Sequence, residues 1–261
     1  MKIIVCIKQV PDTTEVKLDP KTGRLIRDGV PSIINPDDKN ALEEALRIKD
    51  ENPDTTVTVV SMGPPQADVA MREALAMGAD EAILISGREF GGSDTWATSY
   101  IIATAIKKIP DYDIIFCGRQ AIDGDTAQVG PQIAEQLNIP QITYVQKLDI
   151  EDDKVIVQRQ LEDGYAVVEA KMPVLLTAIK ELNTPRYMTP KGIFEAYNKT
   201  VQVWGFNDVP VDAEKIGLKG SPTNVNRTFS PEAKGKGIML EGADKETVKT
   251  LIAKLDEKHL L

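Results

Sequence analysis

The chain has 261 residues, of which 42% are hydrophobic and 27% are charged, as in an ordinary soluble protein with a substantial core. Its 31 lysines and arginines against 40 aspartates and glutamates give a net charge of −9, which argues against nucleic acid or a membrane as a partner. The first residues, MKIIVCIKQVP, contain too short an apolar run for a signal peptide, and no segment reaches the roughly 20 apolar residues of a membrane span. We therefore expect a cytoplasmic protein.

Apolar runs rich in β-branched residues alternate with helical patterns in the first half of the chain. The apolar runs span residues 2–7, 55–62, 81–86 and 113–118. Segments in which Ala, Leu and Ile recur every three or four residues span 37–51, 66–78, 94–108 and 125–137. Asp37, Asp94 and Asp125 stand where helix N-caps belong, and Gly78 stands where a helix would end. This alternation predicts an α/β fold with a doubly wound, mainly parallel Rossmann-like sheet.

Two later patterns add to this sheet. The turn sequence at residues 19–23, between EVKL and RLIR, predicts a β-hairpin over one end of the sheet. From residue 142, strands joined by polar turns predict an antiparallel extension, after which residues 174–179 return to the core.

The composition changes after Thr184, where several Pro and Gly precede one amphipathic helical pattern at residues 243–258. An arm of this kind cannot bury a core of its own. We expect a nucleotide-binding α/β domain over residues 1–184 and a C-terminal arm over residues 185–261 that packs on a partner subunit.

The segment GRQAIDGDTAQVG, residues 118–130, follows a predicted strand and opens a predicted helix. In that position free backbone N–H groups and the helix dipole attract an anion. The segment lacks the lysine of a P-loop and the glycine spacing of the dinucleotide fingerprint. Gly124 and Gly130, with the small side chains of Thr126 and Ala127, would let a ligand approach closely.

Plainer interpretations of this segment remain open. It could be a simple strand-to-helix turn in which Asp125 caps the next helix. A magnesium site at Asp123 and Asp125 is less favoured, because no third oxygen ligand is evident.

Three other predicted strand ends carry small or polar residues, at 35–38, 62–65 and 88–95. Each alone could be an ordinary turn or helix cap. Because all would lie on one edge of the sheet, a ligand of mononucleotide size or larger explains them together.

The remaining reactive residues are few. Cys6 and Cys117 fit no zinc or disulfide spacing, so buried reduced thiols are expected. The single histidine, His259, lies close to the C-terminus, which argues against a mechanism that needs histidine as base or metal ligand.

Five segments resemble the β (small) subunit of electron transfer flavoproteins and occur in the order of that family. They are IVCIKQVPDT, NPDDKNALEEALRIKDE, SMGPPQADVAMREALAMGADEAILI, GRQAIDGDTAQVGPQIAEQL and LNTPRYMTPKGI. The resemblance covers nearly the whole chain and implies an αβ heterodimer whose α subunit holds an electron-shuttling FAD. The loop GDTAQVG and the stretch REFGGSDTWATS resemble the electron-bifurcating branch, whose β subunit binds a second FAD that takes hydride from NADH.

The resemblance also implies the residues of a cofactor site. Those expected at the cofactor are Cys6, Asn35, Asp38, Met62, Gly63, Asp94, Thr95, Thr98, Gly118, Arg119, Gln120, Ala121, Asp123, Thr126, Ala127, Gln128, Val129 and Gly130. Backbone amides from Thr126 to Gly130 would hold the phosphates, and Arg119 and Gln120 would face the flavin. Asp123 would shape the turn or bond a ribose. No catalytic side chain and no metal ion is expected.

Two further sets of residues follow from the resemblance. Arg88, Phe90 and Gly91 are the candidates for the nicotinamide side. The family's recognition loop for partner dehydrogenases falls on Tyr187, Met188, Thr189, Pro190, Ile193 and Phe194, with Pro190 in place of an apolar leucine.

The implied function is that of a subunit in an NAD-dependent flavin oxidoreductase complex, not active alone, with FAD as cofactor and NADH as substrate. Electrons would be divided between ferredoxin or flavodoxin and a flavin dehydrogenase of the acyl-CoA or 2-hydroxy acid type. One alternative is the housekeeping carrier, whose β subunit binds AMP and whose electrons go to a quinone reductase. Another is a stand-alone nucleotide-sensing protein.

Overall fold

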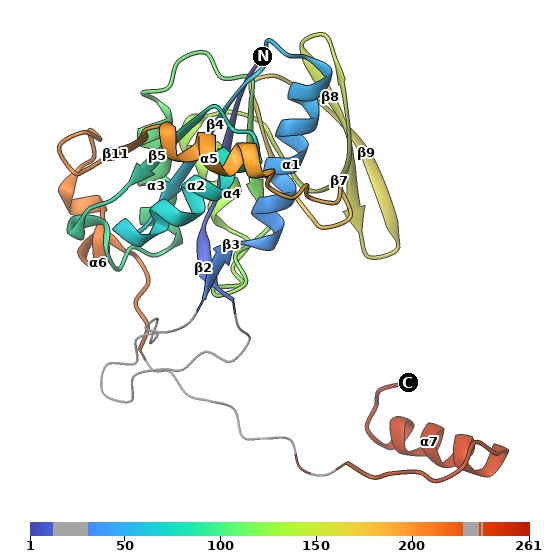
Figure 1. Cartoon of the computed structure of the whole chain (residues 1–261). Coiled ribbons are helices and arrows are strands. Elements are labelled where there is room, and N and C mark those ends of the chain that lie inside the picture. The colour runs from blue at the N-terminus through green and yellow to red at the C-terminus, as the bar shows by residue number, and fades with distance from the viewer. Residues whose placement is uncertain (13–30, 227–234, 236) are drawn as a thin grey trace. The chain divides into compact units, whose positions relative to one another are not determined.

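The computed structural model describes residues 1–12, 31–226, 235 and 237–261 (Figure 1). These residues form two compact units, Met1–Val225 and Asn226–Leu261. The first unit extends past residue 184, where the arm was predicted to begin. The hairpin predicted around residues 19–23 lies outside the described residues.

A nine-stranded sheet forms the centre of the first unit. Its order is β11 (Val201–Trp204), β5 (Glu81–Ile85), β4 (Thr56–Met62), β1 (Lys2–Cys6), β6 (Ile114–Gly118), β10 (Val174–Ala178), β7 (Gln141–Glu151), β8 (Lys154–Leu161) and β9 (Gly164–Lys171). Neighbours from β11 to β7 pair in parallel, whereas β8 pairs antiparallel with both β7 and β9. The predicted α/β class and its antiparallel extension are confirmed.

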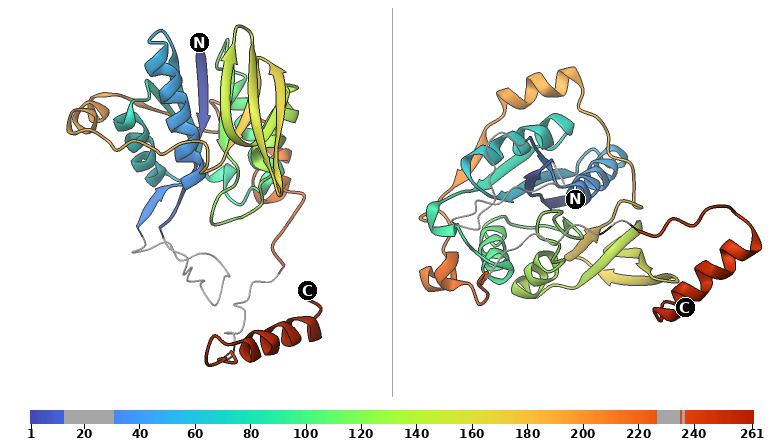
Figure 2. Two further views of the ribbon diagram at one scale, coloured as in Figure 1. Left: turned by 90° about the vertical axis from the view of Figure 1, so that its right-hand side faces the viewer. Right: turned by 90° about the horizontal axis from the view of Figure 1, so that it is seen from below.

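Helices cover both faces of this sheet (Figure 2). Helices α1 (Pro36–Glu51) and α2 (Asp68–Met77) share one apolar cluster with alternate residues of β1 and β4, such as Ile3 and Val57. Helices α3 (Thr95–Ile106) and α4 (Val129–Leu137) share a second cluster with the intervening residues, such as Ile4 and Val60. The central strands are therefore buried on both faces, which explains their nearly continuous apolar sequence.

The shorter elements complete the first unit. Strands β2 (Gln9–Pro11) and β3 (Ser32–Ile34) form a separate antiparallel pair. Helix α5 (Pro190–Asn198) packs on α2. The remaining elements are η1 (Pro65–Ala67), η2 (Arg88–Phe90), η3 (Ala213–Lys215) and α6 (Gly217–Gly220).

Some predicted helix boundaries are confirmed and others are wrong. The Asp94 side chain accepts the N–H of Ala97 at 3.0 Å and caps α3, and Gly78 ends α2 with φ +133°. Asp37 is not an N-cap, because α1 already begins at Pro36, a residue whose fixed φ suits a first helical position.

The described residues of the second unit include helix α7 (Lys245–Glu257), which confirms the late amphipathic pattern. Asp244 caps it by accepting the N–H of Thr247 at 2.9 Å. Its apolar side chains Val248, Leu251 and Ile252 stay about half exposed within this unit. None of the helices in the described ranges combines the length and apolar character that crossing a membrane requires.

Candidate functional site

The loops that follow β1, β4 and β5 line a cavity of about 820 Å³ at the carboxyl ends of these strands. This is the edge at which open α/β sheets bind ligands. The structure brings five of the predicted residues together here, namely Met62, Gly63, Arg88, Phe90 and Gly91. The Phe90 ring is buried in the core, whereas Arg88 is exposed.

Lys8 connects this cavity to the loop after β6. It lines the cavity, and its Nζ lies 2.6 Å from Oδ1 of Asp123, whose side chain is only 8% exposed. The pair ties the loop after β6 to the segment that follows β1. The sequence interpretation missed Lys8, although its place just after a strand end was a usable signal.

Asn35 holds the same loop from the other side. It is fully buried; its Nδ2 donates to the carbonyl of Gln120 at 2.8 Å, and its Oδ1 accepts the N–H of Ile122 at 3.0 Å. Asn35 occupies the N-cap position of α1 but makes no side-chain cap bond to the helix backbone. Its amide therefore positions the loop rather than capping the helix.

Asp38 joins the ends of β1 and β6. Its two carboxylate oxygens accept the N–H of Lys8 at 2.8 Å and the N–H of Gly118 at 2.9 Å. The first turn of α1 lies so close to β6 that a side chain at Gly118 would collide with Asp38. Gly118 is therefore required for the packing of α1 against β6.

Burial raises the pKa of Asp38 from 3.8 to about 7, against the lowering effect of bonds from Lys8, Asn35 and Gly118. A carboxyl whose pKa is raised on folding binds more protons in the folded state than in the unfolded state. Its contribution to stability is therefore complete below about pH 4 and is lost as the pH rises through 7.

We expect the free energy of unfolding to fall with rising pH, by an Asp38 contribution on the order of 2 kcal/mol between pH 5 and pH 7. Urea unfolding of the native chain and of Asp38→Asn at several pH values measures this contribution. Asp38→Asn should be less stable at pH 5, because one N–H loses its acceptor, but should show a flatter pH profile. Parallel profiles for the two proteins would contradict the expectation.

The loop before α4 does not form the predicted helical turn. Asp125 and Ala127 have φ of +47° and +51°, in the left-handed region, and α4 begins only at Val129. The predicted helix start at Asp125 is thus wrong, because left-handed residues interrupt the helical hydrogen bonds. Asp125 instead accepts a bond from Nε2 of Gln120 at 2.8 Å.

This geometry leaves backbone donors free at the start of α4. Gln128 is the N-cap residue and makes no side-chain cap bond. Within the described parts of the chain, no acceptor takes the N–H of Thr126, Ala127 or Gln128. A methyl group added at Gly124 would meet no atom within 4 Å, so this part of the loop is open. Such exposed amides suit an anion.

The starts of α3 and α4 lie next to each other. Thr95 Oγ1 donates to Oε1 of Gln128 at 2.8 Å, and Thr98 follows one turn later on α3. Asp94 caps α3 and also accepts two bonds from Thr223, at 2.9 and 2.7 Å, and its carboxylate supplies no donor for an anion. Thr95 and Gln128 are therefore the side chains placed to complete an anion site.

Other predicted residues have partners within the protein. Arg119 lies 3.2 Å from Asp37 and 6.0 Å from the centre of the Tyr144 ring. The carbonyl of Ala121 accepts two N–H groups within the loop. Gly130 lets α4 pack close to Thr177, so its small size serves helix packing.

The two cysteines are free thiols on neighbouring strands. Cys117 is buried and Cys6 is half-buried. A hydrogen bond with Cys6 and burial raise the pKa of the Cys117 thiol well above its ordinary value, so it stays protonated. The expected reduced thiols are therefore consistent with their surroundings.

Comparison with known proteins agrees with this geometry. Residues 22–209 match the model of the electron transfer flavoprotein domain. The chain belongs to the electron transfer flavoprotein family. It is 62% identical to electron transfer flavoprotein subunit beta of Thermoanaerobacterium thermosaccharolyticum, and the alignment covers all of both chains.

Two relatives carry names that place them in larger complexes. The caffeyl-CoA reductase-Etf complex subunit CarD of Acetobacterium woodii is 59% identical, and the acryloyl-CoA reductase electron transfer subunit gamma of Anaerotignum propionicum is 53% identical. Both alignments cover the whole of each chain. The chain is thus a β-type subunit of an electron-transfer complex, with an α subunit as its partner.

The predicted docking residues lie just before α5 and in its first turns. Tyr187 is 95% exposed and Phe194 is 77% exposed, and Met188 and Ile193 are exposed beside them. Thr189 is the N-cap of α5 and accepts the N–H of Gly192 at 2.9 Å, with Pro190 as the first helical residue.

Helix α5 is held rigidly on α2 beneath this surface. Arg72 donates to the carbonyls of Ala196 at 2.8 Å and Lys199 at 3.0 Å. Its guanidinium also lies 5.4 Å from the ring centre of Tyr197, an exposed residue that the sequence interpretation missed. Exposed aromatics on a fixed helix are typical of a docking surface.

Proposed function

We propose that this subunit binds FAD and accepts hydride from NADH, and that the complex sends one electron to ferredoxin or flavodoxin and the other to a flavin dehydrogenase. Bound FAD would supply both hydride acceptance and single-electron transfer. The proposal includes a cytoplasmic location. The observation that carries it is the cavity of about 820 Å³ beside the open β6–α4 loop, which offers space for a second ligand next to a nucleotide.

The residues present fit a dinucleotide better than a simple capped turn. The exposed N–H groups of residues 126–128 would hold the diphosphate, and Thr95 and Gln128 would add side-chain bonds. A lysine would not be needed to bind the diphosphate, because the backbone N–H groups supply the hydrogen-bond donors. Lys8 and Asn35 would keep the loop in this form.

Arg88 would serve as the residue that positions NADH at the mouth of the cavity. It is exposed there, and its cationic group suits the diphosphate of the coenzyme. We expect Arg88→Ala to raise the KM for NADH about tenfold, with flavin content unchanged. Reduction of the heterodimer by NADH, followed at the flavin absorbance, measures this. Lys191→Ala, at an exposed position on α5, is the matched control; equal effects in both variants would refute the role of Arg88.

The surface around α5 would dock the partner dehydrogenase. Because Phe194 is exposed, Phe194→Ala should change the free energy of unfolding by less than about 0.5 kcal/mol. The KM for the dehydrogenase should nevertheless rise about tenfold, as for an aromatic anchor. The control is Tyr165→Ala, which removes an aromatic residue of 55% exposure on β9. Unchanged kinetics in Phe194→Ala would place docking elsewhere.

Helix α7 would pack on the α subunit as part of the C-terminal arm. Its half-exposed Val248, Leu251 and Ile252 recur three and four residues apart and form one apolar stripe. A stand-alone nucleotide sensor has no use for such a stripe, which favours the heterodimer.

A further inference from the structure

A stretch without regular structure leads from β10 to the proposed docking surface. Residues 183–189 form neither a helix nor a strand, and they end at the N-cap of α5. Tyr187 and Met188, two of the predicted docking residues, lie within this stretch and are exposed. Because no strand pairing or helical hydrogen bonding fixes the course of the stretch, the position of these two side chains depends on its contacts with other elements.

Helix α1 supplies such a contact through a buried carboxylate. The side chain of Glu43 is only 6% exposed. Its Oε2 accepts the backbone N–H of Arg186 at 2.9 Å and Nε of the same residue at 2.9 Å, and its Oε1 accepts Nη2 at 3.1 Å. Both carboxylate oxygens of Glu43 are therefore bonded to Arg186, the residue immediately before Tyr187.

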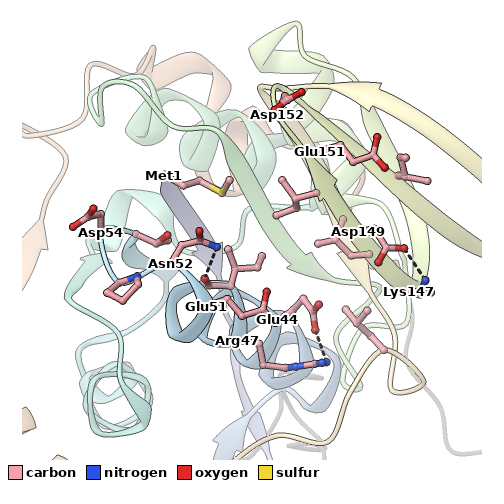
Figure 3. A pocket seen from close by; sticks show the side chains of 17 residues that line it. Met1, Glu44, Arg47, Glu51, Asn52, Asp54, Lys147, Asp149, Glu151 and Asp152 are labelled. Atoms are coloured by element: carbon pink, nitrogen blue, oxygen red, sulfur yellow. Dashed lines mark hydrogen bonds and ion pairs between the residues drawn. The ribbon is translucent and has the colours of Figure 1, made fainter.

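Asn40 and Glu44 hold the beginning of the same stretch. Nδ2 of Asn40 donates to the carbonyl of Asn183 at 2.8 Å, and Nδ2 of Asn183 donates back to the carbonyl of Asn40 at 3.0 Å. Nδ2 of Asn183 also donates to Oε2 of Glu44 at 2.8 Å. Figure 3 shows Glu44 on α1, where it also pairs with Arg47 at 3.3 Å. Helix α1 thus holds the stretch at two points, Asn183 and Arg186.

The pair of Glu43 and Arg186 is suited to fix geometry more than to add stability. Removing a carboxylate and a guanidinium from water costs free energy that offsets much of their attraction. The two parallel bonds from Nε and Nη2 of Arg186, by contrast, require one orientation of the guanidinium plane. Because the third bond comes from the backbone N–H of Arg186, the pair fixes the course of the backbone together with the side chain.

The same helix also carries the contacts that shape the candidate nucleotide site. Asn35 and Asp38, at its start, bond the end of β6 and the loop that follows it. Glu43 follows between one and two helical turns later. The stretch 183–189 and the β6–α4 loop are therefore held by one helix. A dehydrogenase that docks beside Tyr187 would meet the complex at a fixed place relative to a nucleotide in that loop.

We propose that Glu43 and Arg186 are positioning residues for the partner dehydrogenase: the pair holds residues 183–189 on α1 and thereby presents Tyr187 and Met188 to the partner in one arrangement. This inference rests on the proposed docking of a dehydrogenase at the surface around α5. It requires no contact between the partner and the pair, since the guanidinium of Arg186 is already bonded to Glu43.

The test measures electron transfer from the αβ heterodimer to a flavin acyl-CoA dehydrogenase that the native complex reduces. Arg186→Lys keeps the positive charge but cannot form the two parallel bonds to Glu43. We expect the KM for the dehydrogenase to rise about fivefold, because the stretch must be ordered on docking, with kcat, flavin content and NADH reduction unchanged. Glu43→Leu/Arg186→Met, which replaces the pair by apolar side chains, should remain folded and raise the KM at least as much.

Asp50→Asn is the matched control. Asp50 accepts a bond from Nη2 of the same guanidinium at 2.7 Å, but its side chain is 62% exposed. The KM of this variant should stay within about twofold of the native value. Amide hydrogen exchange in residues 183–189 should become faster in the two variants of the pair and not in Asp50→Asn.

Three results would overturn the positioning role. They are an unchanged KM in the variants of the pair, an equal rise in Asp50→Asn, and a loss of kcat or flavin content that accompanies the rise in KM. Phe194→Ala, measured with the same dehydrogenase, reports separately on the proposed docking surface. A raised KM in Phe194→Ala with an unchanged KM in Arg186→Lys would overturn the positioning role alone, whereas an unchanged KM in both would overturn docking at α5 as well.

Discussion

Replacement of Gly118 by alanine is expected to lower the free energy of unfolding by about 3 kcal/mol and to abolish tight nucleotide binding. The new Cβ would lie 2.6 Å from the backbone nitrogen of Asp38 and 2.7 Å from the carbonyl carbon of Asp37. Backbone atoms cannot rotate away as a side chain can, so the first turn of α1 must move away from β6. That movement would break the bond between Asp38 and the N–H of Gly118.

Gly124→Ala is the control within the same loop. No atom lies within 4 Å of the added Cβ, and its φ is outside the region that favours glycine. The free energy of unfolding should change by less than about 0.5 kcal/mol. Urea unfolding of both variants, with the bound nucleotide quantified, makes the comparison. Equal losses in the two variants would contradict the packing account of Gly118.

Replacement of Asn35 by alanine should have the next largest effect. It would leave the carbonyl of Gln120 and the N–H of Ile122 without their partner and would open a space at a fully buried position. We expect a loss of about 2 kcal/mol in the free energy of unfolding and at least a tenfold loss in nucleotide affinity. Nucleotide affinity should fall because Asn35 holds the β6–α4 loop in the conformation that we expect to bind the nucleotide.

Asn35→Asp separates these two roles, because aspartate keeps the acceptor for Ile122 but loses the donor to Gln120. It should bind nucleotide less tightly than the native chain. Asn52→Ala serves as the control, since the Asn52 amide makes, among the described residues, one long bond of 3.4 Å to the carbonyl of Ile48. Native nucleotide affinity in Asn35→Ala would refute the positioning role.

The layered part of the fold could be predicted from the sequence because its signals are local. Runs such as KIIVCI and DIIFCG are buried on both faces, and the helices between them repeat apolar residues at helical spacing. Strand β11 was missed for the opposite reason. Its four residues, VQVW, form a strand by pairing with β5, which lies more than 100 residues away in the chain. No local sequence pattern predicts that pairing.

That the loops after β1, β4 and β5 line one cavity was also predictable, since loops after parallel strands meet at one edge of the sheet. The hydrogen bonds and the ion pair that shape these loops could not be predicted from the sequence. Asp125 resembles a helix cap in sequence, yet its left-handed φ and its bond to Gln120 delay the helix to Val129. Asn35 reaches across 85 positions to Gln120, and Lys8 across 115 positions to Asp123. Such contacts depend on how helices and strands pack, which local patterns do not specify.

We propose that the β6–α4 loop holds a dinucleotide beside a cavity that admits NADH. Quantifying the flavin and the AMP released from the denatured αβ heterodimer distinguishes this from the AMP-binding alternative. We expect two FAD molecules per heterodimer and no AMP. One FAD together with one AMP would refute the proposal and would identify this chain as the subunit of a housekeeping carrier.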